Sequence, residues 1–194
     1  MSTQRIMTGL VVENNDPEKL GRVRLVVPAL PDGPELWARV VSPLAGPDRG
    51  LYFLPEIEDE VLVTFTQGDL SSAYVLGALW GAKKQPPDYV GGIGNEIKAI
   101  KTRSGHLLEF DDGDGSEAIT IKDKNNNTIT IETCTDRIII KSQSEMEISA
   151  DKQMTITADN IIIKAKDISI EADSSFTLDG GASADIQAGT ISLN

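Results

Sequence analysis

The second half of this 194-residue chain repeats one short pattern, in which two apolar residues flank a polar residue and a polar stretch follows. The pattern returns every seven to ten residues from Ile119 to the end of the sequence. Successive side chains of a strand point to opposite faces, so an apolar–polar–apolar triplet is typical of a short strand. The spacing predicts short strands that are joined by tight corners and stacked into an array. The pairs are Ile119/Ile121, Ile129/Ile131, Ile138/Ile140, Met146/Ile148, Met154/Ile156, Ile161/Ile163, Ile168/Ile170, Phe176/Leu178, Ala184/Ile186 and Ile191/Leu193.

A stack of such short strands has to bury its apolar stripe against itself or against copies of the same chain. From Ile119 onward the apolar positions are mostly isoleucine, Phe176 is the only aromatic residue, and there are three glycines. The large side chains that fill an ordinary core are therefore missing from this half. We interpret it as an elongated shaft whose role is mechanical rather than chemical.

The first ninety residues differ in composition, because they contain all nine prolines and most of the aromatic residues. Runs rich in β-branched residues and bounded by Pro, Gly, Asp or Asn predict five short strands. Five such strands without a helical period favour a small barrel of the oligonucleotide-binding type. The aromatic residues Trp37, Tyr52, Phe53, Phe65 and Trp80 are expected to fill its core. The predicted strands are Ile6–Glu13, Gly21–Pro28, Leu36–Val41, Glu60–Thr66 and Tyr74–Leu79.

The formal net charge is −12 at pH 7, and both halves of the chain are acidic. An acidic surface repels nucleic-acid phosphates and anionic lipids, so we expect no nucleic-acid partner. No apolar run approaches the roughly 20 residues that a membrane-spanning helix needs. The N-terminal residues lack the apolar stretch of a signal peptide, and we therefore expect synthesis in the cytoplasm.

Few residues are available for catalysis or metal binding. Cys134 and His106 are the only cysteine and the only histidine, which leaves no partner for a disulfide, a thiolate metal site or a catalytic triad. The carboxylates of Asp111, Asp112 and Asp114 lie in a glycine-containing segment between two strand signals, which is typical of a hairpin turn. A calcium site or a pair of catalytic carboxylates there is the weaker alternative. We expect no enzyme activity, no metal and no cofactor.

Several motifs of the chain occur in a fixed order. They read Asp-Pro-Glu-Lys-Leu-Gly-Arg-Val-Arg at 16–24, Trp-Ala-Arg-Val-Val-Ser-Pro-Leu-Ala-Gly at 37–46, Gly-Leu-Tyr-Phe-Leu-Pro-Glu at 50–56 and Val-Leu-Gly-Ala-Leu-Trp at 75–80. A later segment, 100–112, reads Ile-Lys-Thr-Arg-Ser-Gly-His-Leu-Leu-Glu-Phe-Asp-Asp. Together these motifs closely resemble contractile-tail spike proteins, namely the phage baseplate assembly protein V and the matching part of type VI secretion VgrG proteins.

The resemblance implies a homotrimer, in which three barrels form a collar and three C-terminal segments wind into a triangular β-prism. In that family the prism is the needle that a contracting sheath drives through a target envelope. Some relatives insert a lysozyme between barrel and needle, but only roughly 16 residues separate the two predicted parts here, too few for such a domain. Many relatives carry a Val-x-Gly octad where this chain carries Ile-x-Ile, so the corner geometry is expected to differ.

The predicted fold is all-β, with an oligonucleotide-binding-type (OB) barrel at 1–82, a linker at 83–96 and a triple-stranded β-helix, an intertwined trimeric prism, at 97–194. The predicted function is the structural central spike of a contractile injection machine, such as a phage tail, a tailocin or an extracellular injection system. The alternative is a monomeric β-solenoid that serves as a binding module or adhesin. Expected partners are a trimeric baseplate hub protein and a small conical PAAR-type tip protein. The chain is expected to be assembled into a virion or an extracellular particle, and to contact the target membrane only during injection.

The second member of each apolar pair is expected to point toward the trimer axis. The end of the sequence is expected to dock the tip protein through Ile191, Leu193 and Asn194. No catalytic or metal-binding residue is predicted. The predicted trimer core consists of Ile121, Ile131, Ile140, Ile148, Ile156, Ile163, Ile170, Leu178 and Ile186.

Overall fold

The computed structural model describes residues 6–66, 69–88 and 94–191. The regular elements in these ranges are strands, apart from Thr66, which has a helical conformation. The expected all-β class is therefore confirmed. The chain divides into two units, 1–144 and 145–194, which are described separately below. Within the described residues, no helix is long and apolar enough to cross a membrane.

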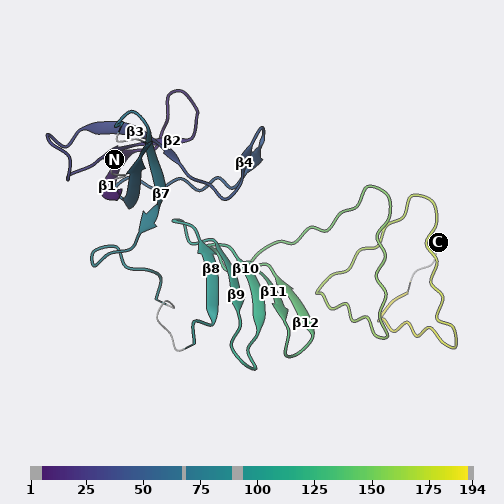
Figure 1. Cartoon of the computed structure of the whole chain (residues 1–194). Coiled ribbons are helices and arrows are strands. Elements are labelled where there is room, and N and C mark those ends of the chain that lie inside the picture. The colour runs from purple at the N-terminus through teal and green to yellow at the C-terminus, as the bar shows by residue number, and fades with distance from the viewer. Residues whose placement is uncertain (1–5, 67–68, 89–93, 192–194) are drawn as a thin grey trace. The chain divides into compact units, whose positions relative to one another are not determined.

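Five strands of the first unit close into a barrel in the order β1-β2-β3-β7-β6 (Figure 1). Only β3 and β7 run parallel, and the other neighbours are antiparallel. The small barrel and its five strands are confirmed, with bounds that differ from the predicted ones by at most two residues. The strands are β1 (Ile6–Glu13), β2 (Arg22–Val26), β3 (Glu35–Val40), β6 (Glu60–Phe65) and β7 (Ala73–Leu79).

The interior of the barrel is filled by β-branched side chains at alternate strand positions. Val11, Val23, Val63 and Val75 are fully buried, as is Leu25. Alternation of this kind is what a half-buried strand requires, since every second side chain points inward. The core of the barrel is therefore built mainly from valine. It is small and tightly filled.

The expectation that aromatic residues fill this core fails for Tyr52, Phe53 and Trp80. Phe65 is buried, but these three side chains are 75%, 62% and 70% exposed. The reason is their position, because Tyr52 and Phe53 belong to the long β3–β6 connection and Trp80 follows β7. The narrow barrel has no room for them.

The β3–β6 connection contains a short hairpin of β4 (Ala45–Gly46) and β5 (Arg49–Gly50). We call residues 41–54 the arm. The Ser42 hydroxyl closes its base, because its oxygen lies 2.9 and 2.8 Å from the carbonyl oxygens of Leu44 and Leu51, and its single proton is shared between these two acceptors. Gly50 has a φ of 151°, and a Cβ atom there would lie 2.6 Å from the Leu44 carbonyl oxygen, so only glycine fits. The arm is thus a defined structure rather than a loose loop.

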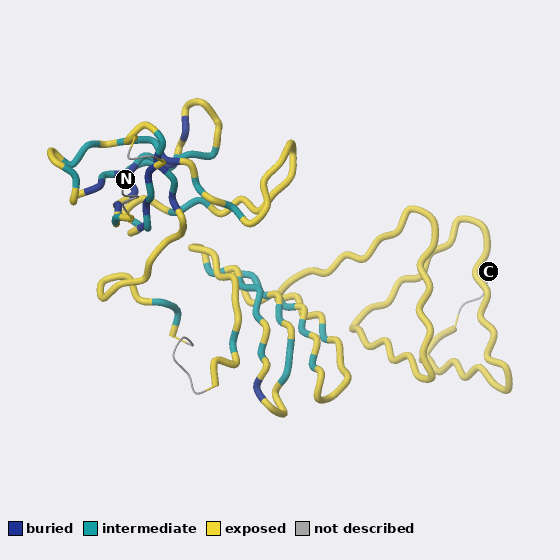
Figure 2. The backbone as a smooth tube through the Cα atoms, viewed as in Figure 1, coloured by how far each residue is buried: buried dark blue, intermediate teal, exposed yellow. Residues whose placement is uncertain are grey.

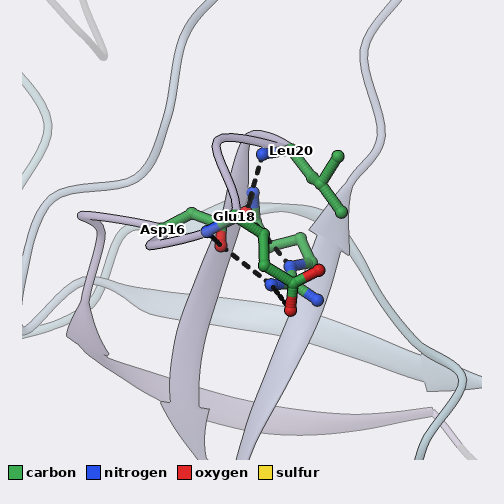
Figure 3. Close-up of polar contacts among 4 residues, drawn as sticks. Asp16, Glu18 and Leu20 are labelled. Atoms are coloured by element: carbon green, nitrogen blue, oxygen red, sulfur yellow. Dashed lines mark hydrogen bonds and ion pairs between the residues drawn. The ribbon is translucent and has the colours of Figure 1, made fainter.

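The Asp16 carboxylate organises the loop between β1 and β2 (Figure 3). It accepts hydrogen bonds from the backbone amides of Glu18, Leu20 and Arg22, at 3.0, 2.9 and 3.3 Å. The Arg22 guanidinium donates two more, over 3.1 Å from Nε and 2.8 Å from Nη2. A carboxylate that is only 8% exposed requires such partners. The loop is folded around this one side chain.

The hydrogen bonds from Arg22 and from the three backbone amides lower the pKa of Asp16 far below its usual range, although burial acts in the opposite direction. Arg22 also contacts Trp37, with its guanidinium carbon 5.4 Å from the centre of the Trp37 ring. Arg24 approaches the same ring at 5.9 Å. Trp37, the remaining predicted core aromatic, is therefore half-buried under two arginines and lies outside the core.

Residues 97–141 form an antiparallel sheet in which each strand pairs with the next, β8 to β12. Residues 89–93 of the predicted linker lie outside the described residues. The domain boundaries predicted near residues 82 and 96 remain predictions. The strands are β8 (Ile97–Lys101), β9 (Leu107–Asp111), β10 (Ala118–Lys122), β11 (Thr128–Glu132) and β12 (Arg137–Lys141).

Carboxylates at the strand ends fix the hairpins of this sheet. Asp111 accepts a hydrogen bond from the Gly113 amide at 2.8 Å, which confirms the predicted turn between β9 and β10. Asp123 accepts from the amides of Asn125 and Asn127, both at 2.8 Å. Burial pulls the pKa of Asp123 upward, but these hydrogen bonds and that of the Asn127 side chain outweigh it and lower the pKa. Such Asx turns specify the hairpin locally.

The second unit has no strand among its described residues, 145–191. The strands predicted from Met146/Ile148 onward are therefore absent from the single chain. Instead the backbone winds through bends or turns at 151–152, 159, 166–167, 173–174, 181–182 and 189, which fall between the apolar pairs (Figure 1). The reason is that a strand needs a hydrogen-bonded neighbour. The successive segments of one chain do not supply it.

The Asp16 loop gives a first test. Because folding lowers the pKa of Asp16, its charge stabilises the folded state above the unfolded pKa of about 4, and this contribution is lost as the pH falls below that value. We expect Asp16→Asn to lower the thermal unfolding midpoint at pH 7 more than Asp32→Asn, a matched change at an exposed site. The deficit of Asp16→Asn relative to the unmodified chain should shrink below about pH 4. A deficit that is independent of pH would contradict this account.

Candidate assembly surface

The register of the five-stranded sheet places the apolar pairs in two rows across one face. Ile121 lies opposite Ile129, which lies opposite Ile140. Ile119 similarly lies opposite Ile131, which lies opposite Ile138. Because directly opposite residues point to the same side of a sheet, the rows are continuous. We call this set the apolar face: Ile100, Leu108, Phe110, Ile119, Ile121, Ile129, Ile131, Ile138 and Ile140.

This apolar face is uncovered in the single chain. Ile131, Ile121 and Ile138 are 41%, 51% and 71% exposed, and Figure 2 shows the strands of the sheet in the colours of exposed and intermediate residues. The opposite face carries Thr120 and Thr130, so only one side of the sheet is strongly apolar. Contiguous apolar surface of this extent is typical of a site that another chain covers.

Three of the predicted trimer-core residues, Ile121, Ile131 and Ile140, are brought together on the apolar face. The sequence-based prediction assigned only the second member of each pair to the core, whereas the apolar face contains both members. The signal was present, because residues two apart in a strand share a face, and the structure places Ile119 beside Ile121 accordingly. It also missed the contribution of Leu108 and Phe110, which extend both rows onto β9.

The other predicted core residues lie in the second unit, where the structure does not bring them together. Every described residue from 142 to 191 is exposed (Figure 2). A segment of this length with no interior gains nothing from apolar burial to offset the entropy of ordering its backbone. The residues are Ile148, Ile156, Ile163, Ile170, Leu178 and Ile186.

Backbone hydrogen bonds are also scarce in the second unit. The described residues 146–191 share one backbone–backbone hydrogen bond, from the Ser183 amide to the Gly180 carbonyl over 3.3 Å. Backbone amides and carbonyls in a folded protein almost always have partners. Among the described residues 146–191, most of these groups are available to pair with another chain.

Of the predicted tip-docking residues, Ile191 is exposed, whereas Leu193 and Asn194 lie outside the described residues. The arrangement of this end therefore rests on the sequence alone.

The described residues contain no group of three or more His, Cys, Asp or Glu side chains that is placed to hold a metal ion. His106 ends the turn that follows β8, and its neighbour Ser104 has its hydroxyl 3.4 Å from that of Thr102. Cys134 is exposed in the turn between β11 and β12.

A comparison with known families identifies the barrel. Residues 7–80 match the family described as the type VI secretion system/phage-baseplate injector OB domain. The matched range begins within β1 and ends just after β7, so it covers the closed barrel and the arm. The match indicates a role related to the spike of these injectors. Residues 7–80 of this chain are thus similar to the injector OB domains of type VI secretion systems and phage baseplates.

Proposed function

We propose that this chain is the central spike of a contractile injection machine, in which three copies form a collar of barrels and one shared needle that pierces the target envelope. The observation that carries the proposal is the absence of any buried residue among the described residues from 142 to 191. A segment of this kind becomes stable only when other chains cover it. The family of the barrel supplies the context of an injector.

Three copies provide what one copy lacks. Burying a large apolar side chain contributes roughly 1.5–3 kcal/mol, whereas ordering one residue of backbone costs roughly 1–2 kcal/mol. Three apolar faces that turn toward one axis bury the rows of Ile121 and Ile131 at once. In the second unit, segments of neighbouring chains then pair their free backbone groups, which forms the triple-stranded β-helix that the repeat predicts.

The regular bends support this intertwined arrangement. They recur every seven or eight residues, as the apolar pairs do, so each straight segment carries one pair and each bend one corner. Three chains in the same register would then form three-sided layers of equal height. Acidic and polar residues between the pairs would face solvent, in keeping with the net charge of −12.

The alternative is a monomeric β-solenoid with a binding role. A solenoid buries a continuous core within one chain by stacking its own coils. The described second unit buries none of its residues, including Ile156 and Ile170. This observation favours the trimer over the solenoid.

The proposal extends to partners and location. A trimeric hub protein would hold the collar. A PAAR-type cone would sharpen the needle at Ile191, Leu193 and Asn194. The assembled particle would act outside the cell that made it and would contact the target membrane only during injection, without an enzymatic step or a cofactor.

The oligomeric state is the first test of this proposal. Light scattering of the full chain should give close to three times 20.9 kDa. Unfolding should be slow and should depend on protein concentration, because dissociation and unfolding are coupled in an obligate trimer. A folded monomer at micromolar concentration would rule the spike out.

The direction of the side chains gives a second test. Ile163→Asp should abolish the soluble trimer, because three carboxylates would meet in a dry interior. Ile162→Asp is a matched control, since this residue is its neighbour and points to the opposite face of a strand. Lys164→Asp, also on the outward side, should be tolerated. If Ile162→Asp disrupts the trimer and Ile163→Asp does not, the predicted faces are exchanged by one residue.

The end of the chain gives a third test. Deleting residues 186–194 removes the last apolar pair, together with Ile186 of the pair before it, and should leave the trimer folded, because the earlier layers remain intact. Particles assembled with the shortened spike should no longer co-purify with the cone protein, as mass spectrometry of purified particles would show. Continued recruitment of the cone would show that Ile191, Leu193 and Asn194 form an ordinary terminus.

A further inference from the structure

The arm carries the most exposed aromatic surface of the described barrel domain. Tyr52 and Phe53 are 75% and 62% exposed, and Leu44 on the other side of the hairpin is 53% exposed. Singly exposed apolar residues are ordinary, but these belong to one segment of fourteen residues, the arm at 41–54. Neither the barrel core nor the apolar face of the sheet accounts for them.

The arm is preformed for contact with another surface. The Ser42 hydroxyl and Gly50 fix its hairpin, as described above. Tyr52 approaches Gly21 in the β1–β2 loop, where a Cβ atom would lie 3.7 Å from the Tyr52 ring. A hollow of about 670 Å³ lies between the arm and this loop. Preorganised surface loses little entropy when it binds.

A second exposed apolar patch lies on other strands of the same barrel. Leu10 of β1 and Leu79 of β7 lie on either side of Glu60 of β6 in one cross-strand row. Their side chains are 42% and 40% exposed, and Trp80, which follows Leu79, is 70% exposed. We call Leu10, Leu79 and Trp80 the barrel patch. It is an apolar surface around one carboxylate.

The two surfaces are complementary in charge as well as in polarity. Arg49 lies at the tip of the arm, and Glu60 lies within the barrel patch. Neither residue has an ion-pair partner in the described part of the chain. A contact between arm and patch would therefore cover two apolar surfaces and pair two opposite charges.

We propose that each arm packs on the barrel patch of the neighbouring copy, with Arg49 toward Glu60, and so closes the collar into a ring. The inference rests on the proposed trimer and adds the contact that joins its barrels. The occupant is a second copy because every copy carries both surfaces, and the two are complementary: each is apolar, and Arg49 of one has the opposite charge to Glu60 of the other. Contacts of that heterologous type form a closed ring when the rotation between copies closes.

Cross-linking tests the contact in the full chain. In a Cys134→Ser background, Phe53→Cys and Leu79→Cys are combined and the protein is treated with a flexible bis-maleimide. We expect covalent dimers and trimers on a denaturing gel. Phe53→Cys with Leu70→Cys is the matched control, because Leu70 lies on the loop at the opposite end of the β6–β7 hairpin. This pair and each single cysteine should give monomers.

The charges provide an independent readout. Arg49→Glu should lower the yield of cross-linked trimer from the Phe53/Leu79 pair, and adding Glu60→Arg should restore it. A trimer by light scattering that gives no cross-link from this pair, or equal cross-linking from the control pair, would overturn the contact alone. That is also the result expected if the arm binds a hub protein instead. A monomer would overturn the proposed function and this contact together.

Discussion

The rest of this structure depends on one constraint: an extended chain cannot bury its own side chains or pair its own backbone without a neighbour. From 142 to 191 each described residue is exposed, although the apolar pairs recur with a period of seven or eight residues. A disordered tail would not require apolar pairs at a constant spacing. It becomes meaningful when identical chains lie in register, because each layer then receives the same residues from every copy. Trimerisation would thus complete the fold of the needle rather than assemble finished domains.

The barrel follows the opposite principle, since it is complete within one chain. Its valine core is fully buried, and the Asp16 carboxylate accepts hydrogen bonds from backbone amides of its own loop. This division would suit the proposed spike, because a self-sufficient collar would present defined surfaces to neighbouring copies while the needle would gain rigidity from shared strands. The sheet of β8 to β12 combines both features. Its strands pair with one another, but its apolar face is exposed and would be covered by other chains in the proposed trimer.

Much of the barrel could be predicted from the sequence, because strand alternation and turn residues are local signals. The five barrel strands and the turn at Asp111 illustrate this. The aromatic core could not, because composition does not reveal that Tyr52 and Trp80 lie outside the barrel strands. The Asp16 loop was also missed as a buried cluster, since its hydrogen bonds depend on the folded path of the chain. In residues 145–191 the sequence shows the repeat period, but the predicted strands are not confirmed. Their hydrogen-bonding partners would come from other chains.

Amide hydrogen exchange over residues 145–191 of the full chain in solution tests the central claim most directly. If backbone groups of neighbouring chains pair along the needle, these amides should exchange slowly, as do those of the barrel strands around Val63 and Val75. Exchange at the rate of an unprotected peptide throughout this range, in a sample whose barrel amides are protected, would contradict the account.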